Sequence, residues 1–178
     1  MIGRIWRQLI FLPTLAWNVL LGRVLTVRKW WHRIDDHVVL GALPFQRDVP
    51  ALEQLGVRSV VNTCIEYAGP DEAYRRHGIR HLRVPTVDFA PPTLEHIDAS
   101  LALMRETAAA GHSTYVHCKA GRGRSATVVM CWLIEQHGMT PAEAQRQLEA
   151  IRPHVNHQLD QRSVVREFYQ RHLQRQGS

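Results

Sequence analysis

The sequence predicts an α/β fold, with a mainly parallel central sheet flanked by helices on both faces. Short runs of β-branched and apolar residues alternate along the chain with longer runs that carry helical capping signals. Strands that alternate with helices form parallel sheets whose two faces the helices cover. With 178 residues, 45% hydrophobic and 21% charged, the chain can build one globular domain with a substantial core.

The predicted strands are short and rich in valine. Val38-Val39-Leu40 is the first, and a turn from Gly41 to Pro44 follows it. The second has a Val-Val core, which is typical of a buried parallel strand. We expect strands over residues 38–40, 58–63, 79–84 and 114–116.

Capping residues define the predicted helices. Thr93 begins one helix that Gly111 closes, and Gly138 is a C-cap. Thr140 and Glu143 form a capping box with proline at the first helical position. We expect helices over about residues 48–56, 71–77, 93–110, 126–137, 141–152 and 157–171.

The N-terminal part of the chain differs from the rest in charge and composition. Residues 1–34 contain six Lys or Arg and no Asp or Glu, which is the whole net charge of +6, and residues 35–178 contain sixteen of each. Because no basic stripe runs through the predicted folded part, nucleic acid is not expected as a partner. Four of the five tryptophans lie in residues 1–31, and tryptophan favours the membrane–water interface.

The uncharged stretch from Gln8 to Gly22 is interrupted by Pro13 and Asn18, and its fifteen residues fall short of the about 20 that a spanning helix needs. We therefore predict that residues 1–31 lie on a membrane surface and residues 32–178 form the folded domain. The alternatives are a helix packed on the domain itself, a cleaved signal peptide or an organellar targeting signal.

Cysteine usage indicates a reducing compartment. Cys64, Cys118 and Cys131 cannot form an even disulfide framework, so we expect all three to be reduced. No Cys/His cluster has the spacing of a zinc site, and we predict neither a metal nor another cofactor.

A loop between the last predicted strand and the following helix carries the strongest functional signal. Backbone N–H groups in such a loop can cradle an anion, and the positive end of the helix reinforces them. A thiol placed there beside cations has a lowered pKa, and an arginine fork suits two phosphate oxygens. The loop reads His117-Cys118-Lys119-Ala120-Gly121-Arg122-Gly123-Arg124-Ser125.

This loop resembles the signature of the cysteine-dependent protein-tyrosine-phosphatase superfamily: His-Cys, five residues, Arg and then Ser. The alternative is a buried structural cysteine, which would not explain why three cations crowd one short turn. The resemblance implies the fold of a dual-specificity-type phosphatase. It also implies a phosphate-binding loop made of Lys119, Ala120, Gly121, Arg122, Gly123 and Arg124.

Thiolate attack on a phosphomonoester gives a phosphocysteine and requires a general acid for the leaving alkoxide. We assign Cys118 as the nucleophile and Asp88 as the acid, because Asp88 lies on a proline-flanked loop thirty residues upstream. The alternative for Asp88 is a turn cap, and Asp71 is the fallback acid. Arg124 is expected to bind the phosphate in the transition state.

Two further side chains are expected to support the thiolate. Ser125 is predicted to donate a hydrogen bond to the sulfur, and His117 to order the loop backbone. Lys119 and Arg122 are not needed for the reaction, so we predict that they lie at the pocket rim and favour a substrate with additional negative charge. The alternative is that both are ordinary solvated charges.

A closer resemblance extends over most of the chain. Five segments are similar to the family of mitochondrial phosphatidylglycerophosphate phosphatases. They are the runs from Trp30 to Asp35 and from Val39 to Pro44, the pair Glu66-Tyr67, the run from Thr86 to Asp88, and the loop itself. Two departures are Gly123, where that family usually has serine, and a missing acid before Glu66. Glu66 and Tyr67 are expected to support the site.

The resemblance implies hydrolysis of phosphatidylglycerophosphate to phosphatidylglycerol, a step of cardiolipin synthesis. The alternatives are a phosphoinositide or phosphoprotein phosphatase, and, from another class, a non-catalytic phospholipid-binding module. We expect a monomer whose partners are an anionic phospholipid substrate and a membrane surface. It would face a reducing compartment at a bacterial or mitochondrial inner membrane.

Cys64 is a candidate redox partner of Cys118. Each cysteine ends a predicted strand, and if those strands are neighbours the two thiols come within reach of a disulfide. The alternative, that Cys64 is a small buried core residue, is slightly favoured.

Overall fold

The computed structural model describes residues 13, 16, 19 and 29–177. A five-stranded sheet with the order β1-β2-β5-β3-β4 lies at its centre. Strand β1 is antiparallel to β2, and the other neighbours are parallel. The strands are β1 (Trp31–Arg33), β2 (Val38–Gly41), β3 (Val57–Cys64), β4 (Arg80–Thr86) and β5 (Ser113–His117).

Strand β5 is the middle strand, and its register brings three strand ends together. Val116 pairs with Leu40 of β2 and with Val61 of β3, and all three are fully buried. One residue later, His117 pairs with Gly41 and Asn62. The carboxyl ends of β2, β3 and β5 therefore share one edge of the sheet, where open α/β sheets bind ligands.

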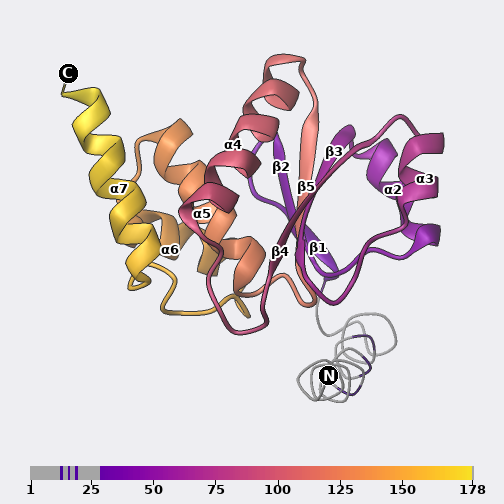
Figure 1. The fold of residues 1–178 in the computed structure, drawn as a ribbon, viewed down its shortest axis with the longest axis horizontal. Helices are drawn as coiled ribbons and strands as arrows, with labels where there is room; N and C mark the ends of the chain where they lie inside the picture. Colours follow the sequence, from indigo (N-terminus) through magenta and orange to yellow (C-terminus); the bar gives the residue numbers. More distant parts are fainter. Residues whose placement is uncertain (1–12, 14–15, 17–18, 20–28, 178) are drawn as a thin grey trace.

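Helices cover both faces of the sheet, as Figure 1 shows, with α4 to α7 on one side and α2 and α3 on the other. The strand alternation explains this arrangement, because Val116 packs in the larger core cluster and its neighbour Tyr115 in the smaller one. The predicted fold class is confirmed. The helices are η2 (Gln46–Asp48), α2 (Val49–Gln54), α3 (Asp71–Arg76), α4 (Leu94–Ala109), α5 (Arg124–His137), α6 (Pro141–Ile151) and α7 (Ser163–Gln176).

The capping signals act as the sequence indicates. Thr93 accepts a hydrogen bond from the backbone N–H of His96 at 3.2 Å, and Thr140 and Glu143 form a reciprocal capping box. Gly138 ends α5 in the left-handed conformation, with φ of 63°. Helices α4, α5 and α6 consequently begin and end close to the predicted positions.

The predicted start of the last helix, at His157, is wrong, because α7 begins at Ser163 and runs past residue 171 to Gln176. The backbone before α7 is held by hydrogen bonds to a side chain instead of by helical backbone hydrogen bonds. Gln145 Oε1 accepts hydrogen bonds from the backbone N–H groups of Leu159 and Asp160 at 3.0 and 3.3 Å. Residues 152–162 therefore form a loop.

The predicted boundary at residue 31 is also corrected. Trp30 is buried, donates its indole N–H to the Leu43 carbonyl at 3.0 Å and stacks on Phe45, and Trp31 begins β1, a strand that was not predicted. Both tryptophans thus belong to the folded domain. The rest of the predicted membrane segment lies largely outside the described residues. In the part of the chain that is described, no helix is both long and apolar enough to cross a bilayer.

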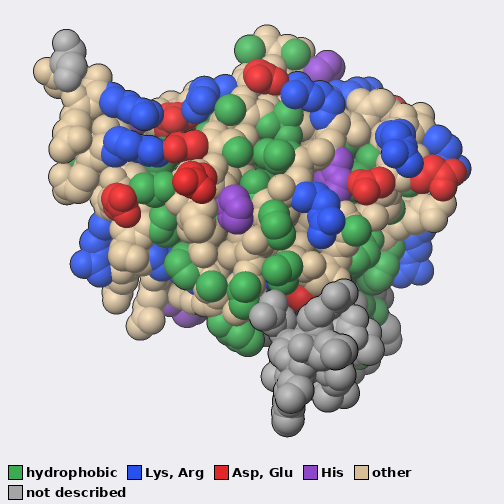
Figure 2. Space-filling model, viewed as in Figure 1, with side chains coloured by type: hydrophobic (Ala, Val, Ile, Leu, Met, Phe, Trp, Pro, Cys, Tyr) green, Lys and Arg blue, Asp and Glu red, His purple; other side chains and the backbone are tan. Residues whose placement is uncertain are grey.

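Charged side chains of both signs are spread over the face seen in Figure 2. On that face Lys and Arg lie near Asp and Glu, with hydrophobic side chains between these groups. This agrees with the balanced charge of residues 35–178.

Gln145 offers a test of how the loop before α7 is held. Its side chain is buried and binds the backbone of residues 156, 159 and 160. We expect Gln145→Met to lower the free energy of unfolding by about 2–3 kcal/mol, because buried N–H groups lose their acceptor. Urea denaturation measures this change. Gln147→Met on the same helix is the control, and an equal loss in both variants would contradict the assigned role.

Candidate active site

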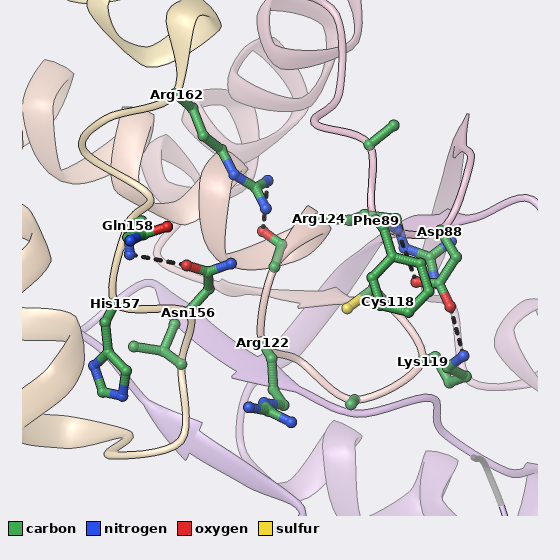
Figure 3. A pocket seen from close by; sticks show the side chains of 14 residues that line it. Asp88, Phe89, Cys118, Lys119, Arg122, Arg124, Asn156, His157, Gln158 and Arg162 are labelled. Atoms are coloured by element: carbon green, nitrogen blue, oxygen red, sulfur yellow. Dashed lines mark hydrogen bonds and ion pairs between the residues drawn. The ribbon is translucent and has the colours of Figure 1, made fainter.

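The loops that follow β3, β4 and β5 meet at the carboxyl edge of the sheet, and the segment before α7 closes the far side. The loops after β4 and β5 and this segment enclose a cavity of about 680 Å³. Its volume is in the range of sites that bind whole small molecules. Figure 3 shows its lining residues, which are Asp88, Phe89, Ala90, Cys118, Lys119, Ala120, Arg122, Gly123, Arg124, Val155, Asn156, His157, Gln158 and Arg162.

Cys118 lies at the base of this cavity, in the loop between β5 and α5, and is almost fully buried. Its sulfur accepts hydrogen bonds from the backbone N–H of Gly121 at 3.2 Å and from the Ser125 hydroxyl at 3.3 Å. Burial alone would raise the pKa of the thiol. The charge of Arg124 and the hydrogen bonds from Ser125 and the backbone of Arg122 outweigh it and lower the pKa to about 7.

The loop passes very close to β2 at Gly121. This residue has φ of 66°, and a Cβ atom there would lie 2.4 Å from the Gly41 carbonyl oxygen. Only glycine tolerates both conditions. The close approach turns the N–H of Gly121 towards the Cys118 sulfur.

A buried arginine that the sequence analysis missed supports the loop from behind. Arg152 Nε donates to the Gly121 carbonyl at 2.8 Å, and Nη2 to the Ala120 carbonyl at 2.9 Å. Its Nη1 donates to His32 Nδ1 at 2.7 Å, and burial together with this charge lowers the pKa of His32 to about 4. By holding the carbonyl groups outward, Arg152 leaves the loop N–H groups free to face the anion site.

Arg124 is fixed by two acceptors, one on the loop after β3 and one at the end of β4. Its Nη1 donates to Glu66 Oε2 at 2.9 Å and to the Thr86 carbonyl at 2.8 Å. Its Nη2 is buried and lies 3.0 Å from Asp88 Oδ1, without the geometry of a hydrogen bond. The guanidinium is therefore held in place with donor capacity remaining on the side of Asp88.

Asp88 lies over the loop, and Lys119 Nζ donates to its Oδ2 at 2.5 Å (Figure 3). The prediction that Lys119 lies at the pocket rim is therefore wrong, since its side chain is largely buried against Asp88. Asp71, the fallback acid, is the first residue of α3 and pairs with His81. The structure thus brings Asp88 to Cys118 and Arg124, and places Asp71 with a different partner.

The supporting residues Glu66 and Tyr67 lie on the loop after β3. Asn62 Nδ2 donates to the Tyr67 carbonyl at 2.8 Å, and the Tyr67 hydroxyl donates to the Pro44 carbonyl at 2.7 Å. These bonds tie the loop to β3 and to the segment after β2. The carboxylate of Glu66 is thereby held against Arg124.

His117 is fully buried at the end of β5. Burial lowers its pKa to about 3, so the ring is neutral at physiological pH. Its Nδ1 lies 3.3 Å from the Cys118 carbonyl oxygen, which fixes Nδ1 as the protonated nitrogen. This contact fits the predicted role in ordering the loop backbone.

Cys64 ends β3, which is the neighbour of β5, as the redox hypothesis requires. Both thiols are free. Burial and the nearby Cys118 charge raise the pKa of Cys64. A resolving thiol must ionise before it can attack, so this shift disfavours the redox role, which stays a prediction.

Sequence reasoning also missed Arg162 and the segment around Asn156. Arg162 is the N-cap of α7 and lines the cavity. Asn156 donates its backbone N–H to the Arg122 carbonyl at 2.9 Å. No motif surrounds these residues. Because a helix was predicted from residue 157, this segment was not considered as a loop that could line the site.

A low-pKa thiol beneath an anion-binding loop, with a fixed arginine and a carboxyl group above it, defines a cysteine-dependent phosphatase. Residues 38–171 match the family described as dual specificity phosphatase, catalytic domain, and the chain belongs to this family. Among the described residues, no group of three or more His, Cys, Asp or Glu could hold a metal ion.

Three relatives illustrate the similarity. Phosphatidylglycerophosphate phosphatase PTPMT2 of Arabidopsis thaliana is 41% identical over 90% of this chain and 72% of its own length. Phosphatidylglycerophosphatase and protein-tyrosine phosphatase 1 of Mus musculus is 37% identical over 91% of this chain and 89% of its own. A crystal structure of PTPMT1 in complex with PI(5)P superposes with a TM-score of 0.76, 34% identity and coverage of 83% of this chain and 99% of that one.

The hydrogen bond from Ser125 makes the thiol pKa testable. We expect the rate of Cys118 alkylation by iodoacetamide to rise with pH around a midpoint near 7, because only the thiolate reacts. Ser125→Ala removes a donor to the charged sulfur and should move the midpoint up by about one pH unit. The control is Ser100→Ala, a buried serine bonded to His96 on α4. An unchanged midpoint in Ser125→Ala would refute the assigned contact.

Proposed function

We propose that this phosphatase removes the terminal phosphate of phosphatidylglycerophosphate and releases phosphatidylglycerol. The observation that carries the proposal is a cavity of about 680 Å³ beside Cys118, lined by four Lys or Arg side chains. A single phosphate would occupy only a small part of it. The names of the Arabidopsis and mouse relatives support the same substrate.

In the proposed reaction the Cys118 thiolate attacks phosphorus while the bond from phosphorus to the glycerol oxygen breaks. Asp88 gives a proton to that oxygen, and a phosphocysteine remains. Arg124 and the loop N–H groups stabilise the charge that spreads over the phosphoryl oxygens.

In the second half, Asp88 accepts a proton from a water molecule whose oxygen attacks the phosphocysteine. The bond from sulfur to phosphorus breaks, and inorganic phosphate and the thiolate are released. The hydroxyl of Ser125, 3.3 Å from the sulfur, supports Cys118 as leaving group. Glu66 acts through Arg124, by holding its guanidinium in position.

A phosphate-release panel tests the substrate. We expect the highest kcat/KM for phosphatidylglycerophosphate in neutral vesicles, ahead of PI(5)P and of soluble phosphotyrosine peptides. PI(5)P is included because the complex with PTPMT1 carries it. Cys118→Ser is the inactive control, and Cys131→Ala, a buried core cysteine, should retain activity. Preference for the soluble peptides would overturn the lipid assignment.

The rim of the cavity supports contact with a lipid surface. Of four large hydrophobic side chains that are exposed in the described residues, three lie on the loops after β3 and β4: Ile65, Val87 and Phe89. Phe89 is 85% exposed and has a positive φ of 66°, which is uncommon for a bulky residue. An aromatic ring held outward beside Asp88 can enter the lipid interface as the headgroup enters the cavity.

We expect Phe89→Ser to lower the ratio of activity on vesicle-bound substrate to activity on a soluble chromogenic ester by about five- to tenfold, because burial of the ring in lipid is lost. Leu173→Ser, an exposed hydrophobic residue on α7, is the matched control. An unchanged ratio in Phe89→Ser would contradict the proposed contact.

We further propose that the N-terminal segment up to residue 28 adds to membrane binding and that the enzyme is a monomer on an inner membrane, facing a reducing compartment. The basic, tryptophan-containing composition of that segment supports the membrane binding, and the odd number of cysteines supports the reducing compartment. A chain that begins at Lys29 should sediment less with anionic vesicles while it retains the soluble activity.

A further inference from the structure

The cavity beside Cys118 contains two arginines that the proposed reaction does not use. Of the described residues that line it, four are cations and one, Asp88, is an acid. Two of the cations, Lys119 and Arg124, already face Asp88. The other two are Arg122 and Arg162.

Arg122 and Arg162 bind neutral partners. Arg122 Nε donates to the His154 carbonyl at 2.6 Å, and Arg162 Nη1 donates to the Thr127 hydroxyl at 2.7 Å. Within the described part of the chain, neither guanidinium has a carboxylate oxygen within 4.0 Å. Their charges therefore remain uncompensated by this part of the protein.

The Arg162 guanidinium lies directly over the phosphate-binding loop. Its Nη1 is 3.5 Å from the Gly123 carbonyl oxygen, and a Cβ atom at position 123 would lie only 3.3 Å from Nη2. The guanidinium of Arg162 therefore packs closely against this loop position. Arg162 is half-buried, and burial lowers its pKa while the Cys118 thiolate opposes this shift, so the two groups are close enough to interact.

The ion pair of Asp88 and Lys119 and the two remaining arginines occupy different sides of the cavity. In Figure 3, Asp88 and Lys119 lie on one side of Cys118, whereas Arg162 and Arg122 lie on the other, next to Asn156 and Gln158. A ligand that places one phosphate over the sulfur could extend its next group towards the side of the cavity that carries these two arginines.

We propose that Arg122 and Arg162 form a second anion subsite, which binds the phosphodiester of the substrate while its terminal phosphate lies over Cys118. This inference rests on the proposed function and names the group that decides its specificity. A phosphodiester is permanently charged, and a planar guanidinium can bind two of its oxygens. Arg162 is partly buried and has no acidic partner among the described residues, so it gains more from such an anion than a fully solvated cation would.

The test uses two soluble esters, so that binding to vesicles does not enter. Glycerophosphoglycerophosphate is the deacylated headgroup and carries a diester and a monoester, and glycerol 3-phosphate carries the monoester alone. We expect the full chain to prefer the first by at least about tenfold in kcat/KM. Arg162→Gln should lower that preference by about tenfold, mainly through KM, and higher salt should lower it in the parent enzyme.

Two more variants separate binding from loop support. Arg122→Gln removes an exposed side chain and should also lower the preference, whereas Arg166→Gln, on the outer side of α7, should leave it unchanged. Thermal unfolding of each variant shows whether it folds. Equal losses on both esters in Arg162→Gln, or an unchanged preference in both pocket variants, would overturn the subsite.

The experiments give different results if the subsite proposal is wrong and if the proposed function is wrong. If the full chain prefers the two-phosphate headgroup through Arg162 but does not act on phosphatidylglycerophosphate in vesicles, the lipid function is refuted and the subsite stands. If it acts on the lipid and the preference does not depend on Arg122 or Arg162, the subsite is refuted and the lipid function stands.

Discussion

A negative charge buried at Cys118 is the constraint on which the rest of the site depends. Burial opposes ionisation of the thiol, so positive charge and hydrogen bonds to the sulfur must outweigh it. Arg124 provides the charge, and Glu66 and the Thr86 carbonyl hold it in place. The loop provides N–H donors, and Arg152 keeps their carbonyl groups turned away. Because the strand ends pack closely at one edge of the sheet, all of these groups lie near the Cys118 sulfur.

The parts of the site that could be predicted from the sequence are those with a local signal. The loop from His117 to Ser125 is contiguous, and Asp88 follows a strand whose end reaches the same edge, so topology alone places them together. The helices α4, α5 and α6 have capping residues at their ends. The fold class followed from local patterns, and the family resemblance together with the strand order indicated that the loop and Asp88 lie at one site.

The parts that were missed depend on contacts between distant residues. Arg152 and Arg162 stand outside any motif, and only packing of the C-terminal segment against the loop brings them to the site. The helix start at residue 157 was wrong because Gln145, on the previous helix, satisfies the backbone at 159 and 160. Trp30 resembled a membrane residue by composition, yet its indole N–H binds the Leu43 carbonyl within the domain.

The ion pairs of Asp88 have a consequence for ligand exchange. In this structure the Asp88 carboxylate forms ion pairs with both Lys119 and Arg124. It therefore takes the place beside Arg124 that a bound anion would need. A phosphate that enters must compete with this carboxylate for Arg124, so free sulfate or phosphate from the solvent binds less tightly than to bare cations. Occupancy of the pocket by an anion therefore requires Asp88 to give up part of its contact with these two cations.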